Sequence, residues 1–373
     1  MRIAIISPNR DAWSETFIVD IIRGLVGEKH VLIDGHLPRR HADGSPILGN
    51  SLVERIRRTF AVRVLGRTMD QVLEDRIVGW LREKQIQVVL AEYGPTGVAM
   101  LPLCKRAGIP MVVHFHGVDA WHKGMLAKYE AAYRPMLREA AGVVAVSLEM
   151  VDHLAAMGAP RERLHHISCG VDTTRFTMGD PATAPPVFLA AGRFVDKKGP
   201  ALTLLAFNEL AKEEATAHLV LVGDGPLLET CRRLCTAFGL DDRVTFTGAL
   251  PHEQVRLRML QARAFVQHSI ATTENDREGT PVSVLEAMAS GLAVIATRHA
   301  GIKDAISHEV NGLLCDEGDV RTMAVNMRAV LRDPALATRL GIAARARVQE
   351  AYAQRITIGA LQQVLEEAAG IAK

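Results

Sequence analysis

The sequence has few cysteines, almost no net charge and no long apolar run, and each shortage excludes a class of protein. Five scattered cysteines without a CxxC pair predict neither a disulfide framework nor a zinc site. A net charge of +2 argues against a protein that wraps nucleic acid, and we expect no nucleic-acid partner. No stretch approaches the roughly 20 apolar residues of a transmembrane helix, and the start lacks the apolar core of a signal peptide. We therefore expect a soluble, cytoplasmic chain.

The 373 residues are 48% apolar, which is enough for two domain cores. Short β-branched apolar runs alternate with segments of helical period, a pattern typical of parallel sheets covered by helices on both faces. The expected strands are Arg2–Ile6, Val31–Ile33, Val88–Ala91, Met111–Phe115 and Val143–Val146, then Val187–Ala190, Leu219–Val222, Val244–Thr247, Ala264–Gln267 and Ala293–Ala296. The sequence thus predicts the α/β class, with two doubly wound domains in tandem.

A proline-rich connector, residues 180–186, stands directly before the first strand of the second series. We therefore place the domains at residues 1–178 and 179–351. The end of the chain has helical period and no following strand. Because ligands of doubly wound sheets bind beyond the C-terminal ends of the strands, we look for chemistry in the loops there, and the cleft between two such domains is the natural site.

Two cations follow the first strand of the second series. Arg193 and Lys198 precede a helix whose N-terminus itself favours anions, so the pair suits a diphosphate. The alternative is a solvated basic turn. Gly223 lies in a second loop, Val-Gly-Asp-Gly-Pro, that also ends a strand. It does not complete a dinucleotide G-x-G-x-x-G motif, because Leu228 occupies the third position, so a nicotinamide dehydrogenase is disfavoured.

The most informative segment is a loop and helix at residues 278–291. Its proline can begin the helix and leave the amides of Val282 and Ser283 to meet an anion. Glu278 precedes the helix and Glu286 lies about two turns along it, so the two carboxylates can reach different parts of one ligand. The alternative is ordinary acidic residues at a helix start and on its solvent face.

The spacing of Glu278 and Glu286 resembles the E-x7-E signature of retaining family 4 glycosyltransferases. Further segments match this family in the same order, namely residues 170–176, 192–199 and 222–226. Three more are similar to its exopolysaccharide subgroup, the colanic acid and amylovoran type, namely residues 14–18, 114–119 and 272–279. The resemblance covers nearly the whole chain.

The resemblance implies the GT-B fold, two facing Rossmann-like domains with an interdomain cleft, and a final helix at about 352–372 that packs back on the first domain. It implies transfer of a hexose, with retention, from a nucleotide-diphosphate sugar to a glycan or lipid-linked saccharide in surface or exopolysaccharide biosynthesis. A polyprenyl-diphosphate-linked acceptor is one such saccharide. No metal and no other cofactor is expected. The alternatives are a non-catalytic nucleotide-sugar-binding protein and a nucleotide-sugar epimerase on the same scaffold.

The resemblance also implies roles for single residues. Arg193 and Lys198 would bind the donor diphosphate and stabilise the charge on the leaving nucleotide. Glu286 would hydrogen-bond the ribose, and Glu278 the transferred sugar, although a carboxylate there could instead be a covalent nucleophile. The rest of the expected donor site is Gly223, Gly279, Thr280, Val282 and Ser283.

His116 closes an expected strand and points to the same side as His114. A His-x-His pair can bind a metal ion, but the sequence shows no third ligand, so we expect no metal site. The alternative for His116 is a packed or hydrogen-bonded loop histidine. The resemblance places His116 at the reaction centre with Asp119 close behind on the acceptor side, and makes His114 structural.

The loop after the first strand departs from the Gly-Gly pattern of many family members. Its residues Ser14, Glu15 and Thr16 either contact the acceptor or cap the first helix.

Residues 39–67 hold seven arginines against two acidic residues, with apolar residues interleaved. They predict an amphipathic basic helix that rests on an anionic membrane leaflet, the inner face of the plasma membrane. The alternative is a solvated basic face packed on the sheet. The arginines expected at the membrane are Arg55, Arg57, Arg58, Arg63 and Arg67.

Overall fold

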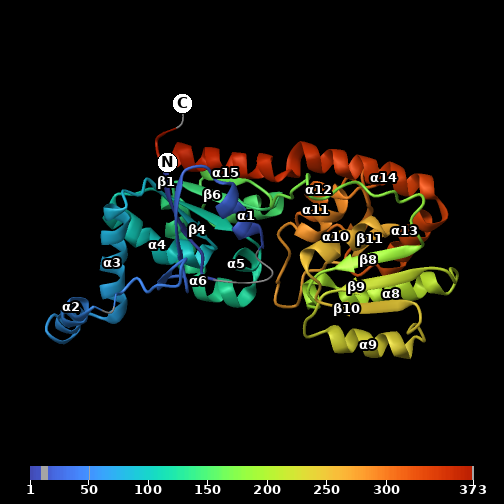
Figure 1. Cartoon of the computed structure of the whole chain (residues 1–373), viewed down its shortest axis with the longest axis horizontal. Coiled ribbons are helices and arrows are strands. Elements are labelled where there is room, and N and C mark those ends of the chain that lie inside the picture. Colours follow the sequence, from blue (N-terminus) through green and yellow to red (C-terminus); the bar gives the residue numbers. More distant parts are fainter. Residues whose placement is uncertain (10–15, 50, 372–373) are drawn as a thin grey trace. The chain divides into compact units, whose positions relative to one another are not determined.

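A computed structural model describes residues 1–9, 16–49 and 51–371 (Figure 1). The chain forms two compact units: unit 1 comprises Met1–Val146, Met150–Ile167 and Ile358–Lys373, and unit 2 comprises Ser147–Glu149 and Ser168–Thr357. The chain thus passes into unit 2 at Ile167–Ser168 rather than at residue 178. The reason is that Val171 and Phe176, which precede the proline-rich connector, are already buried in a core of unit 2.

Unit 1 contains a seven-stranded sheet in the order β3-β2-β1-β4-β5-β6-β7, in which only β3 runs antiparallel to its neighbour. Its strands are β1 (Arg2–Ile6), β2 (Glu28–Ile33), β3 (Arg40–His41), β4 (Val88–Glu92), β5 (Met111–Phe115), β6 (Gly142–Ala145) and β7 (Leu164–His166). Its helices are α1 (Thr16–Gly24), α2 (Leu52–Arg63), α3 (Met69–Glu83), α4 (Gly94–Ala107), α5 (Val118–Trp121), α6 (Lys123–Glu139), most of α7 (Leu148–Ala156), the short turn Arg161–Arg163 and most of α15 (Gln354–Ala368).

The last helix, α15, completes the core of unit 1. Leu361 and Leu365 are buried among Ile3, Ile5 and other side chains of the central strands. A helix that follows all the strands of unit 2 in sequence therefore supplies apolar surface to the first sheet, where its burial stabilises that unit.

Unit 2 contains a six-stranded, all-parallel sheet in the order β10-β9-β8-β11-β12-β13. Its strands are β8 (Val187–Ala191), β9 (His218–Val222), β10 (Val244–Gly248), β11 (Ala264–Gln267), β12 (Ala293–Thr297) and β13 (Leu313–Cys315). Its helices are α8 (Pro200–Ala211), α9 (Leu228–Ala237), α10 (His252–Leu260), α11 (Val282–Ala289), α12 (Ile302–Ala305), α13 (Val320–Arg332) and α14 (Pro334–Arg347), with a short turn at Asp196–Lys198 and a π-helical stretch at Val348–Tyr352.

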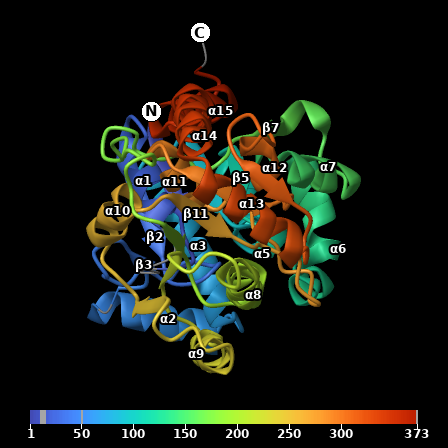
Figure 2. The ribbon, with the colours of Figure 1, turned by 90° about the vertical axis from the view of Figure 1, so that its right-hand side faces the viewer.

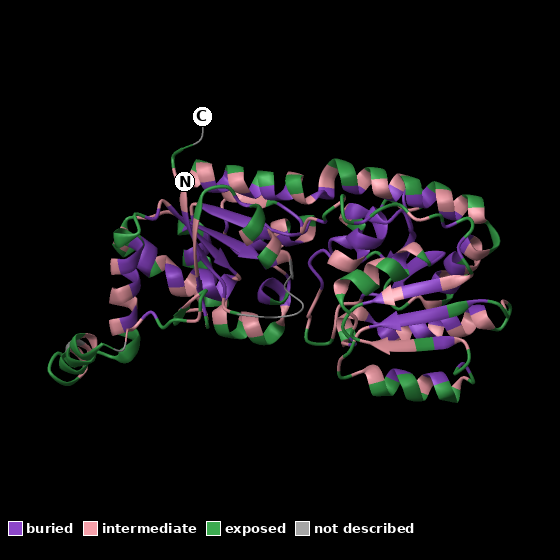
Figure 3. Cartoon of the chain, viewed as in Figure 1, coloured by how far each residue is buried: buried purple, intermediate pink, exposed green. Residues whose placement is uncertain are grey.

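The central strands of the sheet of unit 2 are buried on both faces (Figure 3). One core takes side chains from α8, α9 and α13, and the other from α10, α11 and α12. α8 and α13 pack side by side on the first face (Figures 1 and 2). Cys231 and Cys235 are buried in that core as free thiols.

All ten expected strands are present to within three residues at either end. Both sheets follow the doubly wound order 3-2-1-4-5-6, with β7 added at the end of the first, so the α/β class and the two Rossmann-like folds are confirmed. None of the helices in the described part of the chain is long and apolar enough to span a membrane.

Candidate functional site

The first group of candidate residues lies at the topological switch point of unit 2. There β8 and β11 are neighbours, although the chain leaves β8 toward β9 on one side and continues from β11 to β12 on the other. A crevice forms outside the carboxyl ends of two such strands and is the usual ligand site of this fold. Arg193 and Lys198 follow β8, and Glu278 stands in the loop that follows β11.

Lys198 and Glu278 form an ion pair, with 3.0 Å between Nζ and Oε2, and their side chains are only 15% and 9% exposed. Burial alone would raise the pKa of Glu278, but the ammonium groups of Lys198 and Lys197 outweigh it and lower that pKa. The second carboxylate oxygen, Oε1, is buried and has no hydrogen-bond partner among the described residues. The pair therefore offers an ionised carboxylate, one oxygen of which can still accept a hydrogen bond.

A histidine that the sequence argument missed fixes the backbone of Glu278. The amide of Glu278 donates to Nε2 of His299 at 3.1 Å, and Nδ1 of the same ring lies 2.6 Å from Oε1 of Glu317. Because Nε2 accepts, the ring proton is on Nδ1 and is donated to Glu317. Glu317 in turn accepts from the amide of Ala271 at 2.8 Å. This chain of bonds holds the loop before α11 in place.

The N-terminus of α11 presents two open amides beside this pair. The helix begins after Pro281 without a side-chain cap. Within the described residues, the amides of Val282 and Ser283 have no acceptor, whereas the Ser283 hydroxyl donates to Gln267 Oε1 at 3.1 Å. Open amides at a helix start attract anions.

The preceding residues Gly279 and Thr280 lie against Gly301, whose amide donates to the Gly279 carbonyl at 2.9 Å; a Cβ on Gly301 would lie 2.1 Å from the Thr280 hydroxyl. Thr280 itself is buried.

Glu286 lies on the buried side of α11 and is 5% exposed, so it does not belong to a solvent face. Its Oε1 is 2.6 Å from Nε2 of His252, the first residue of α10. The ring of His252 packs edge-on against Phe176. Sequence reasoning missed His252, because nothing in its local pattern indicates that α10 brings it to α11.

Glycines let the loops after β8 and β9 approach each other. Gly223 has a φ of +138°, and a Cβ there would lie 1.9 Å from the carbonyl oxygen of Gly192. A pocket opens at this place, lined by Gly192, Arg193, Lys198 and Gln267 among others. The Arg193 side chain is exposed at its edge. Arg193 and Lys198, the two cations expected at the diphosphate, therefore line one concave surface.

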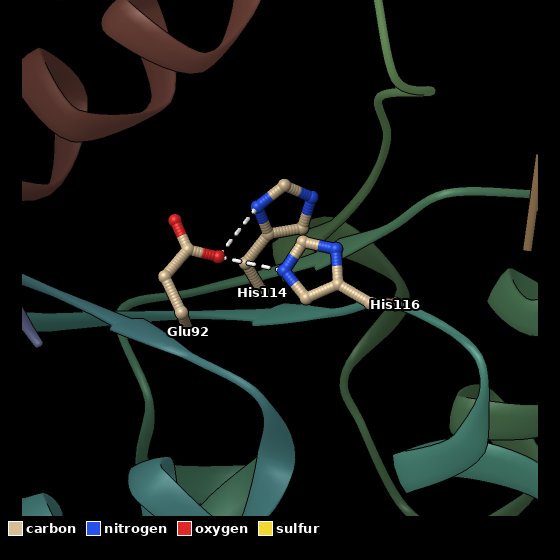
Figure 4. A group of neighbouring side chains, drawn as sticks. All are labelled: Glu92, His114 and His116. Carbon is tan, nitrogen blue, oxygen red and sulfur yellow. Dashed lines mark hydrogen bonds and ion pairs between the residues drawn. The ribbon is translucent and has the colours of Figure 1, made fainter. Parts of the chain in front are cut away.

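The second group of candidate residues lies at the corresponding edge of unit 1 (Figure 4). Glu92 ends β4 and is paired in register with His114 of β5. One oxygen, Oε2, lies 2.6 Å from Nε2 of His116 and 3.3 Å from Nδ1 of His114. Glu92 and His114 are 0% and 3% exposed. Glu92 is thus a third group beside the His-x-His pair, which corrects the expectation that none was present.

The three side chains form a tight group in which Glu92 and His116 are spaced as hydrogen-bond partners rather than as two ligands of one ion. Each offers a ligand atom, and these atoms lie within 4.8 Å of one another. Two ligands of a tetrahedral zinc ion, each about 2.1 Å from the metal, lie about 3.4 Å apart. The 2.6 Å between Glu92 and His116 is instead a charge-assisted hydrogen bond.

Asp119 holds the loop around His116 together. It is fully buried, and its Oδ1 accepts from the amides of His116 and Gly117 at 3.0 and 2.9 Å. Its Oδ2 accepts from the amide of Gly94 at 2.9 Å. With both oxygens bonded to backbone, this carboxylate positions the loop.

Of the four residues predicted on the acceptor side, Ser14 and Glu15 lie outside the described residues. Thr16 begins α1, and Asp119 holds the loop around His116.

Two family models match consecutive parts of the chain. The family described as "Glycosyltransferase Family 4" matches residues 14–175, and "Glycosyl transferases group 1" matches residues 176–347. A GDP-mannose-dependent α-(1-6)-phosphatidylinositol monomannoside mannosyltransferase of Mycolicibacterium smegmatis is 31% identical over 65% of this chain and 67% of its own. The chain belongs to the family 4 glycosyltransferases. The resemblance drawn from Glu278 and Glu286 is thereby confirmed.

Two more similar proteins complete the comparison. The putative colanic acid biosynthesis glycosyltransferase WcaL of Escherichia coli is 30% identical over 65% of this chain, and the match spans 61% of WcaL's length. HepE of Anabaena, solved in complex with UDP, superposes with a TM-score of 0.78 over 98% of this chain and 100% of its own, at 17% identity. This structural likeness confirms the GT-B fold, an assembly of two Rossmann-like domains.

Proposed function

We propose that this glycosyltransferase transfers a hexose from a nucleotide-diphosphate sugar to a saccharide acceptor, with retention, in surface or exopolysaccharide biosynthesis. The observation that carries the proposal is the half-used carboxylate of Glu278, buried beside Lys198 at the switch point of unit 2. A buried acceptor without a donor costs free energy until a ligand supplies one, and a sugar hydroxyl is such a donor. The likeness to a colanic acid enzyme supports the biosynthetic class.

The donor would be held along the pocket of unit 2. Lys198 and Arg193 neutralise the diphosphate together with the amides of Val282 and Ser283. Glu286, oriented by its hydrogen bond to His252, accepts from the ribose hydroxyls. The remaining donor contacts that we propose are the backbone of Gly223, where a side chain would clash with Gly192, and the backbone of Gly279 and Thr280.

In the transfer, the bond between the anomeric carbon and the diphosphate oxygen breaks, and its electron pair stays with the nucleotide. The acceptor hydroxyl forms the new bond on the same face, and its proton passes to the departing phosphate oxygen. Lys198 and Arg193 stabilise the negative charge that builds on that phosphate. Glu278 holds the transferred sugar, and His116 contacts a hydroxyl at the reaction centre. The proposed mechanism requires no metal ion.

Nucleotide binding can be tested by thermal unfolding of the wild type and of Glu286→Ala with UDP, GDP, ADP and their sugar conjugates, in EDTA. The similar proteins point to different bases, since one is GDP-mannose-dependent and the other holds UDP. At a hundredfold excess over Kd a ligand adds about 2.7 kcal/mol, a rise in midpoint of about 5–10 °C. Glu229→Ala, an exposed change on α9, is the matched control.

One nucleotide should stabilise the wild type and the control but not Glu286→Ala. No shift with any nucleotide would overturn the proposal. Turnover then separates the alternatives: an epimerase changes the sugar without any acceptor, and a binding protein leaves the donor intact.

We also propose that α2 rests on an anionic membrane, where a polyprenyl-diphosphate-linked acceptor is found. The apolar side chains of this segment are not packed on the sheet: Leu52, Ile56 and Phe60 are 72%, 60% and 53% exposed. At 100° per residue they fall on one 80° arc of the helix. A helix with an exposed apolar stripe and several arginines has the composition of an interfacial helix. The arginines of this segment are Arg55, Arg57, Arg58, Arg63 and Arg67.

Co-sedimentation with phosphatidylglycerol vesicles tests this contact. Each arginine near an anionic surface contributes about 1 kcal/mol, so Arg55→Glu, Arg58→Glu and Arg63→Glu together should weaken binding at least about 100-fold. The matched control reverses Arg134, Arg232 and Arg233, which are exposed on other helices. Equal binding by both triple variants at low salt would refute the membrane contact.

A further inference from the structure

Glu92 is a buried carboxylate whose role neither the sequence nor the family match supplies. It ends β4, which is the neighbour of β1 at the switch point of unit 1. One of its oxygens faces His116 and His114, and the other is buried without a hydrogen-bond partner in the described part of the chain (Figure 4). Burying a carboxylate completely at this place costs free energy, so its contacts call for an explanation.

The hydrogen bond at 2.6 Å determines which nitrogen of His116 carries a proton. Burial alone would raise the pKa of Glu92, but the interactions with His114 and His116 outweigh it and lower that pKa. An ionised carboxylate can only accept, so Nε2 of His116 must be the donor. In the neutral ring Nδ1 is then an acceptor, and this atom is buried with no hydrogen-bond partner among the described residues.

The ring of His116 is also fixed in orientation. Phe17 and Tyr93 pack against it with ring centroids 4.7 and 4.8 Å away, and the ring of His114 lies tilted against it at 4.1 Å. The backbone amide of His116 is bonded to Asp119. Packing fixes the plane of the ring, and Glu92 determines which ring nitrogen carries the proton. The unpaired acceptor Nδ1 therefore points in one direction.

We propose that Glu92 is a positioning residue that holds His116 in the Nε2–H tautomer, so that Nδ1 accepts a hydrogen bond from a substrate hydroxyl. This inference rests on the proposed function, in which His116 contacts the reacting sugar. A carboxylate that selects a histidine tautomer in this way is a general device of active sites and metal sites. Glu92 itself neither forms nor breaks a covalent bond in this role.

The tautomer can be read directly by NMR of protein labelled with ¹⁵N-histidine, with the His116 signals assigned from a His116→Gln variant. We expect the wild type to show a neutral ring protonated on Nε2. In Glu92→Gln, whose amide can also donate, this preference should weaken or reverse, and Glu92→Asp should restore part of it. A ring protonated on Nδ1 in the wild type, a doubly protonated ring at neutral pH, or an unchanged tautomer in Glu92→Gln would overturn the inference.

Kinetics supply the second readout. Glu92→Gln should lower kcat about 10- to 100-fold while KM for the donor changes less than about threefold, and Glu92→Asp should recover part of the loss. Glu83→Gln, an exposed change on α3, should leave both unchanged. Full activity in Glu92→Gln would overturn the inference. If the wild type transfers no sugar at all, the proposed function fails, but the NMR result still decides the tautomer.

A metal analysis tests the alternative that these side chains bind an ion. Stoichiometric zinc in the purified protein, retained through dialysis and lost in His114→Ala and Glu92→Gln, would show an ion site and refute the hydrogen-bonded arrangement. Absence of bound metal together with the Nε2–H tautomer would support it.

Discussion

The ion pair between Lys198 and Glu278 makes a quantitative prediction for the variant Lys198→Met. Methionine keeps the apolar stem of the lysine but removes the charge that compensates a carboxylate only 9% exposed. Removing one partner of a buried pair typically costs about 3–5 kcal/mol. Because Lys197 and His299 still act on Glu278, we expect the lower end, a loss of about 3 kcal/mol in the free energy of unfolding.

The sign of the pH dependence follows from the direction of the pKa shift. The pKa of Glu278 is lowered in the folded protein from its ordinary 4.5, so the pair stabilises the fold above that pH and loses its effect as the pH falls through the lowered value. Without Lys198, burial raises the pKa of the carboxyl, which then takes up a proton at a higher pH. The deficit of the variant should therefore be largest near neutral pH and shrink toward pH 4.

Calorimetry is the appropriate assay, because all three tryptophans lie within residues 1–146 and fluorescence therefore reports on unit 1. A loss of about 3 kcal/mol corresponds to a fall in midpoint of about 6–12 °C. The double variant with Glu278→Gln should recover about 2 kcal/mol, since it no longer buries an unpaired charge.

Lys212→Met, which breaks an exposed pair with Glu209, is the control and should change stability by less than about 0.5 kcal/mol. A deficit that is independent of pH between 4 and 8, or a double variant no more stable than Lys198→Met, would refute the reasoning.

Three further changes test other supports of the site. Gly223→Ala adds a Cβ 1.9 Å from the Gly192 carbonyl at a positive φ, so we expect urea unfolding to show a loss of about 2–4 kcal/mol. Asp119→Asn places an amide against one of three backbone N–H groups and should cost about 2–3 kcal/mol in the same assay; an unchanged midpoint would mean that these bonds do not hold the loop. His252→Ala removes the partner of Glu286 and should weaken nucleotide binding about 3- to 10-fold in titration calorimetry. Equal affinities of the variant and the wild type would contradict this expectation.

The sequence predicts the central strands because they are buried on both faces and read as apolar β-branched runs. The described strands that it does not reveal are short edge elements: Arg40–His41 and Leu164–His166 have little apolar content of their own, and Leu313–Cys315 is apolar but only three residues long. Their pairing is decided by the neighbouring strand. The passage into unit 2 at Ser168 is likewise set by packing, because a loop without secondary structure supplies part of that core.

The residues of the candidate site were likewise predictable only in part. Glu278 and Glu286 could be placed relative to each other, because one loop and one helix carry both of them. Their partners could not, since His252 and His299 come from elements whose proximity depends on the sheet order. Glu92 was missed for a related reason: only the register of β4 against β5 brings it to the two histidines.

Glycosyl transfer itself is tested most directly by ¹H NMR of the anomeric protons during incubation with UDP- and GDP-hexoses whose sugar is α-linked, with water and simple saccharides as acceptors. The account predicts release of the nucleoside diphosphate and an α-configured sugar as the first product, with the rate strongly reduced in Lys198→Met. A β-configured first product, or a sugar epimerised while still attached to its nucleotide, would contradict it, as would donors that all remain intact.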